Sequence, residues 1–103
     1  MSTTRLEKLQ ALLKTEPNDA FLNFGLAMEL AKAGRFDECL AQFDRVQLLD
    51  PHYIAAYFQK GRTLLSMGDA DRARAELNRG IAAATESGDL HARGEMEELL
   101  ASM

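Results

Sequence analysis

The chain has 103 residues, enough for one domain with a modest core, and its 47% apolar share argues against disorder. The formal net charge is -4 and no segment is strongly basic, so the charge pattern of a nucleic-acid-binding protein is missing. The single cysteine excludes an internal disulfide, and no apolar run approaches the ~20 residues of a membrane-spanning helix. We therefore expect a cytoplasmic protein that binds neither nucleic acids nor membranes.

The first predicted helix covers residues 4–16. Thr4 and Glu7 have the T-x-x-E spacing of a capping box, in which the two residues close the start of a helix. An apolar set with helical spacing follows, made up of Leu6, Leu9, Leu12 and Leu13.

An internal repeat of 34 residues organises the rest of the chain. Pro17 returns as Pro51, and Gly34 returns as Gly68 at the same distance. Three further pairs share this frame: Ala27 with Gly61, Leu30 with Leu64, and Phe43 with Leu77. Because several independent positions agree, the frame predicts two copies of one structural unit.

Each unit has the pattern of two helices joined by a turn. In the first unit a helix is expected over about 19–32, with Leu22, Leu26 and Leu30 on one stripe. Gly34 ends it, and a second helix runs to about residue 49, before Pro51.

The second unit repeats this layout. Its first helix is expected over about 53–66, and its second starts near residue 70. Thr85 stands where the first unit has its closing proline, so this second helix should continue to Ser87. After Gly88, a last helix covers Leu90 to Leu100, with Glu95, Glu97 and Glu98 expected on its outer face.

These residues fit a known pattern, W-x2-L-G-x2-Y, then A-x3-F, then P. The first unit supplies Asn23, Leu26, Ala27, Leu30, Cys39, Phe43 and Pro51. The second unit supplies Tyr57, Lys60, Gly61, Leu64, Ala73 and Leu77. The layout resembles the tetratricopeptide repeat (TPR), as found in small stand-alone bacterial proteins of that family.

The resemblance implies an all-α fold, a right-handed α-α superhelix of about six helices in antiparallel pairs with a C-terminal capping helix. One TPR domain would cover residues 1–103. Its parts would be an N-terminal half-repeat helix at 4–16, a first repeat at 20–53, a second repeat at 54–87 and the capping helix at 89–102.

Three details of the second unit follow from this pattern. Lys60 takes a usually apolar position, so we expect its stem to extend towards water along the surface. Glu76 is interleaved with arginines, which favours a solvated face. Gly61 and Ala73 should face each other where the two helices cross.

The sequence offers no site for catalysis. His91 and Glu95 are spaced i, i+4 and could share a metal, but metal sites need three or four ligands, so a surface pair is the preferred interpretation. Cys39 is expected to be a buried small hydrophobe. We assign no catalytic, metal-binding or cofactor-binding residue, and we expect that the protein is not an enzyme.

In stacked repeats, the first helix of each unit lines a concave groove. The predicted groove consists of Phe21, Phe24 and Met28 in the first unit and Phe58, Gln59, Arg62 and Leu65 in the second. The alternative is that this apolar stripe is internal core, covered by the terminal helices.

The predicted function is that of an adaptor that binds an apolar or amphipathic segment of a partner protein. The alternative is a self-assembling module, a homodimer in which a second copy closes the groove. Some relatives hold chaperone carboxyl-terminal peptides with a clamp of lysine, asparagine and arginine, but Phe24, Met28, Ala55 and Gln59 occupy those places here. The sequence therefore argues against that ligand. We also expect Phe24→Glu to abolish binding without changing the melting temperature.

Overall fold

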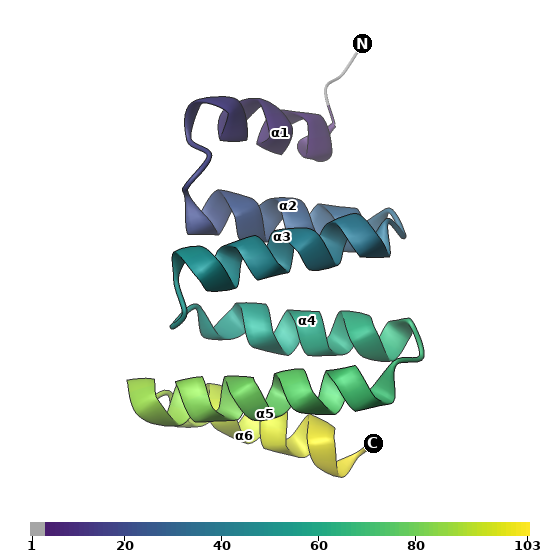
Figure 1. The fold of residues 1–103 in the computed structure, drawn as a ribbon, viewed down its shortest axis with the longest axis vertical. Coiled ribbons are helices and arrows are strands. Elements are labelled where there is room, and N and C mark those ends of the chain that lie inside the picture. Colours follow the sequence, from purple (N-terminus) through teal and green to yellow (C-terminus); the bar gives the residue numbers. More distant parts are fainter. Residues whose placement is uncertain (1–3) are drawn as a thin grey trace. The chain divides into compact units, whose positions relative to one another are not determined.

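The computed structural model describes residues 4–103, and this part of the chain is helical with no strand (Figure 1). Its six helices are α1 (Arg5–Thr15), α2 (Ala20–Lys32), α3 (Phe36–Leu49), α4 (Ile54–Ser66), α5 (Ala70–Ser87) and α6 (Leu90–Ala101). None of these helices combines the length and apolar character needed to cross a membrane. The all-α prediction is confirmed.

The chain divides between Asp50 and Pro51 into two compact units. Unit 1 contains α1, α2 and α3, and unit 2 contains α4, α5 and α6. The division falls within three residues of the predicted boundary between the repeats at 53 and 54. That residues 1–103 form a single domain stays a prediction, and residues 1–3 lie outside the described part.

In unit 1, α2 pairs with α3 in antiparallel fashion and α1 packs on α2 (Figure 1). Leu26 and Leu30 of the predicted stripe are buried, and Leu22 is half-buried. Gly25 allows α1 to approach, because a side-chain carbon at this glycine would lie 3.3 Å from Leu9 Cδ2. The core of this unit comprises Leu9, Leu26, Ala27, Leu30, Cys39, Leu40, Phe43 and Val46.

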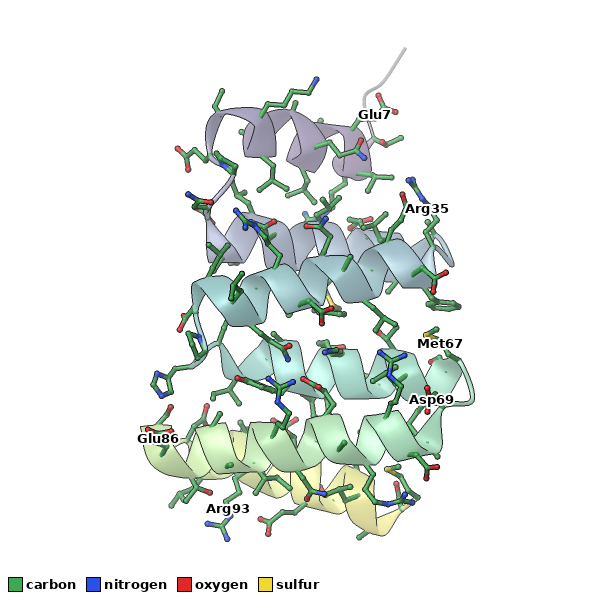
Figure 2. The ribbon with its side chains drawn as sticks, in the orientation of Figure 1. Glu7, Arg35, Met67, Asp69, Glu86 and Arg93 are labelled. Carbon is green, nitrogen blue, oxygen red and sulfur yellow. The ribbon has the colours of Figure 1, made fainter. Side chains whose placement is uncertain are left out.

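The helix ends follow the local signals in the sequence. Gly34 and Gly68 end α2 and α4 with φ angles of 72° and 80°, in the left-handed region that favours glycine. At the turn between α4 and α5, Asp69 Oδ1 accepts a hydrogen bond from Arg72 N at 3.2 Å (Figure 2). Thr4 Oγ1 accepts from Glu7 N at 3.1 Å, which confirms the predicted cap of α1.

One repeat position ties the proline turn to the helix that follows it. Asn23 Nδ2 donates a hydrogen bond to the Pro17 carbonyl at 3.1 Å. Tyr57, 34 residues later, donates from its hydroxyl to the Pro51 carbonyl at 2.7 Å. The side-chain amide in unit 1 and the phenol in unit 2 thus bind the proline carbonyl at the equivalent position of each repeat.

In unit 2, α5 packs against both α4 and α6. Gly61 lies so close to α5 that a side-chain carbon there would be 2.8 Å from Leu77 Cδ2. The nearest atoms to this position therefore belong to Leu77, and the expected approach of Gly61 to Ala73 stays a prediction. Ala73 itself is fully buried.

Helix α5 has 18 residues and α3 has 14, which confirms the predicted extension past Thr85. The added turn covers residues 84–87 and begins with Ala84, which is buried in one cluster with Tyr57, Leu77, Ala83 and Met96. The extension therefore supplies part of the surface on which α6 packs.

Lys60 and Glu76 form an ion pair inside unit 2. Lys60 Nζ lies 3.3 Å from Glu76 Oε2, and their side chains are only 10% and 6% exposed. Arg79 Nη1 lies 3.0 Å from the same carboxylate oxygen. The predictions of a solvent-directed Lys60 and a solvated Glu76 were both wrong, because each residue finds an opposite charge across the α4–α5 contact.

Replacing Gly61 by leucine should destabilise the protein by about 1–3 kcal/mol, because fully buried Leu77 has no space to move into. Urea denaturation measures this change. Gly94 is the control: nothing lies within 4 Å of its added carbon, so Gly94→Leu should be neutral or up to about 1 kcal/mol stabilising through helix propensity. Equal midpoints for the two variants would contradict the close crossing.

Removing Glu76 alone should be costly, since the cations of Lys60 and Arg79 then both lose the negative charge of a carboxylate that is only 6% exposed. We expect Glu76→Gln to lower the free energy of unfolding by roughly 3 kcal/mol. The double variant Lys60→Leu/Glu76→Gln takes the residues that unit 1 has at these repeat positions, Leu26 and Gln42. It should return to within about 1 kcal/mol of the unmodified chain, or exceed it. A double variant less stable than Glu76→Gln alone would refute this.

Candidate functional site

Unit 2 contains a cleft between α4 and α6 with a volume of about 410 Å³. Helix α4 contributes one face to it, made up of Ile54, Ala55, Phe58, Gln59 and Arg62. The beginning of α6 contributes Asp89, His91, Ala92 and Glu95. We call this the α4/α6 cleft.

The apolar part of the cleft centres on Phe58. Its ring is half-buried and packs on the core cluster of unit 2, together with Ile54 and Ala92. The Arg62 guanidinium carbon lies 5.7 Å from the centroid of this ring. Such cation–π contacts are worth about 0.5–1 kcal/mol at exposed sites, and here the contact holds the arginine over the aromatic surface.

The polar groups on the α6 side interact with one another or with the backbone. Asp89 Oδ1 accepts a hydrogen bond from Ala92 N at 3.1 Å and caps α6. His91 Nε2 lies 3.2 Å from Glu95 Oε1, an ion pair when the imidazole is protonated. Among residues 4–103, no third His, Cys, Asp or Glu side chain joins this pair in a group that could hold a metal ion.

The predicted groove residues of unit 1 differ in exposure. Phe21 is 70% exposed near the start of α2. Phe24 is half-buried, and its ring centroid lies 5.9 Å from that of Phe43, which is fully buried. Met28 is also half-buried. Phe24 therefore contributes to the core of unit 1 as well as to its surface.

In unit 2 the structure brings together three of the four predicted residues, since Phe58, Gln59 and Arg62 line the same cleft. Leu65 is half-buried further along α4 and does not line it. The part of the predicted stripe from Phe58 to Arg62 therefore faces the cleft, and Leu65 lies beyond it.

The sequence did not predict that α6 forms one wall of the cleft. Glu95 was assigned to an outer face, but it lines the cleft with a side chain that is 50% exposed. The spacing of His91 and Glu95 placed them on one helical face without indicating what that face contacts. The buried Met96 next to Glu95 fixes the orientation of α6, and its burial depends on Gly80 of α5.

Comparison with protein families gives a match over residues 30–93 to the model described as tetratricopeptide repeat. The chain belongs to the tetratricopeptide-repeat family. It is 30% identical over 95 residues to the TPR repeat-containing protein PA0015 of Pseudomonas aeruginosa, covering 92% of this chain and 90% of that protein. The resemblance inferred from the repeat frame is confirmed.

Solved structures agree with this fold. Protein BPP2914 from Bordetella parapertussis superposes with a TM-score of 0.86 at 30% identity, over 98% of this chain and 88% of that one. A tetratricopeptide repeat domain protein from Salinibacter ruber gives a TM-score of 0.78 at 27% identity, over 84% and 87%. PcrH, solved in complex with the chaperone binding region of PopD, gives 0.86 at 20% identity, over 94% and 74%.

The contact with Phe43 changes the expected effect of altering Phe24 in this TPR protein. Phe24→Glu should lower the free energy of unfolding by about 1–3 kcal/mol, because a charge then replaces half-buried apolar area. Phe21→Glu should change it by less than about 0.5 kcal/mol. Circular dichroism melting of the two variants makes the comparison, and equal melting temperatures would contradict a core role for Phe24.

Proposed function

We propose that this TPR protein binds an apolar or amphipathic segment of another protein, and that the α4/α6 cleft is its principal contact. Proteins of this family are generally interaction modules rather than enzymes, which supports the coarse assignment. Each unit contributes candidate contact residues of its own. They are Phe21, Phe24 and Met28 on α2 of unit 1, and Phe58, Gln59, Arg62 and Leu65 on α4 of unit 2.

The observation that carries the proposal is the half-buried ring of Phe58 in an open cleft of about 410 Å³. Ligand sites in proteins are concave and mostly apolar, with a few polar groups that fix orientation. Ile54, Ala55 and Ala92 extend the apolar area, and Gln59 and Arg62 add polar groups on the same helix. An apolar side chain of a partner would bury additional surface against Phe58, which favours binding by about 25 cal/mol per Å² before association costs.

A solved complex of this fold offers a precedent. The structure of PcrH with the chaperone binding region of PopD has a protein of similar fold holding a segment of another protein. For the present chain we propose the class of partner, an apolar or amphipathic segment of another protein. The concave groove and the cytoplasmic location stay predictions.

Self-assembly is the second candidate. Several large apolar side chains are well exposed, namely Leu12, Phe21, Leu48 and Leu90. Exposed apolar area of this kind also suits a contact between two copies of the chain. Size exclusion with light scattering separates the candidates, because the adaptor should be a monomer and the self-assembling module a stable dimer.

Ala55→Glu tests the cleft directly. Ala55 is exposed and lines the cleft, so the variant introduces a charge without removing core packing. Peptides are first selected on the unmodified protein from a phage-displayed library of random 12-residue segments. We expect Ala55→Glu to weaken the selected peptides about tenfold or more, measured by fluorescence polarisation, because a buried unpaired charge opposes apolar contact.

Ala75→Glu is the matched control. Ala75 is an exposed alanine of α5 outside the cleft, and its replacement should leave peptide affinity unchanged. Equal weakening by both variants would place the binding surface elsewhere or indicate a general charge effect. Failure of the unmodified protein to select any peptide would count against the adaptor function.

A further inference from the structure

Arg62 differs from the other arginines in the described part of the chain. No carboxylate of residues 4–103 lies within ion-pair distance of its guanidinium, which contacts the Phe58 ring instead. Each of the seven other arginines has a polar side-chain partner. The pairs are Arg5–Glu29, Arg35–Glu38, Arg45–Asn18, Arg72–Asp69, Arg74–Asp71, Arg79–Glu76 and Arg93–Glu97.

Gln59 lies one helical turn before Arg62 and lines the same cleft. Its backbone carbonyl accepts a hydrogen bond from Thr63, while its side-chain amide has no hydrogen-bond partner among residues 4–103. The amide and the guanidinium therefore present hydrogen-bond donors from one face of α4.

The acidic groups across the cleft already have partners within α6. Asp89 accepts from the Ala92 backbone, and Glu95 pairs with His91. What remains for a ligand is a cation and an amide donor beside an aromatic ring. A carboxylate complements this set, because guanidinium and amide donors can both bind one carboxylate group.

We infer that Arg62 and Gln59 bind one internal Asp or Glu side chain of the partner segment, an inference that rests on the proposed function of the cleft. A neighbouring apolar residue of the segment contacts Phe58, so the partner chemistry is an apolar segment with one acidic residue at a fixed spacing from its apolar anchor. A phosphate group suits the cleft less well, since a single cation faces two carboxylates on the opposite wall.

The same peptide library tests this inference. Peptides selected on the unmodified protein should carry Asp or Glu at one fixed distance from an apolar residue. They are resynthesised with an amidated carboxyl terminus in matched pairs that differ only by Glu or Gln at that position. Fluorescence polarisation should show that the Gln peptide binds about three- to tenfold more weakly, the effect of one partly exposed charge-assisted hydrogen bond.

The variant Arg62→Gln should lose most of the preference for the Glu peptide, because only neutral amide donors remain beside the carboxylate. Arg74→Gln is the matched control, because Arg74 is an exposed arginine of α5 outside the cleft, and it should keep the full preference. Selected peptides without an acidic residue at a fixed position would overturn the inference, as would an undiminished preference for Glu in Arg62→Gln. Binding that requires a free carboxyl terminus, or a dimer that closes the cleft, would overturn it as well.

The outcomes also separate this inference from the proposed function. If Ala55→Glu abolishes binding while Arg62→Gln keeps the preference for Glu, the cleft binds peptides but the assignment of Arg62 is wrong. If Ala55→Glu has no effect, the cleft is not the binding site and both proposals fail.

Discussion

Both units depend on the close approach of paired helices at positions without a bulky side chain. In unit 2, Gly61 admits Leu77 of α5, and Gly80 admits Met96 of α6. In unit 1, Ala27 and Cys39 are fully buried on the two paired helices. A helix of 11 to 18 residues cannot bury its apolar face alone, so these contacts decide which faces become core and which remain available.

The signals that could be predicted from the sequence act locally. Proline and glycine end helices through their own backbone restrictions, so Pro51, Gly34 and Gly68 set the frame without knowledge of distant contacts. The Lys60–Glu76 pair could not be found in this way. Its members are separated by 16 residues and meet only because α4 packs against α5. A repeat pattern indicates that position 60 is internal, but it does not indicate the charge that faces it.

The candidate site likewise has one part that the sequence predicts and one part that it does not. The stripe containing Phe58 and Arg62 follows from helical spacing, because both residues lie on one helix. The opposite wall was not predictable from spacing, since the position of α6 depends on how far α5 continues past Thr85. Glu95 and Met96 are neighbours in sequence, yet one lines the cleft and the other is fully buried.

The buried ion pair of unit 2 also bears on how a repetitive chain folds correctly. Two units with the same helical pattern offer each helix two similar partners, which makes mispairing a characteristic hazard of repeat proteins. Unit 1 has Leu26 and Gln42 where unit 2 has Lys60 and Glu76. If α2 paired with α5, Glu76 would face an apolar leucine, and if α4 paired with α3, Lys60 would face an uncharged glutamine. Each exchange would lose the buried Lys60–Glu76 contact, and Arg79 of the same helix would stay with Glu76 in either case, so the pair favours the native partnership of α4 with α5 over both exchanges.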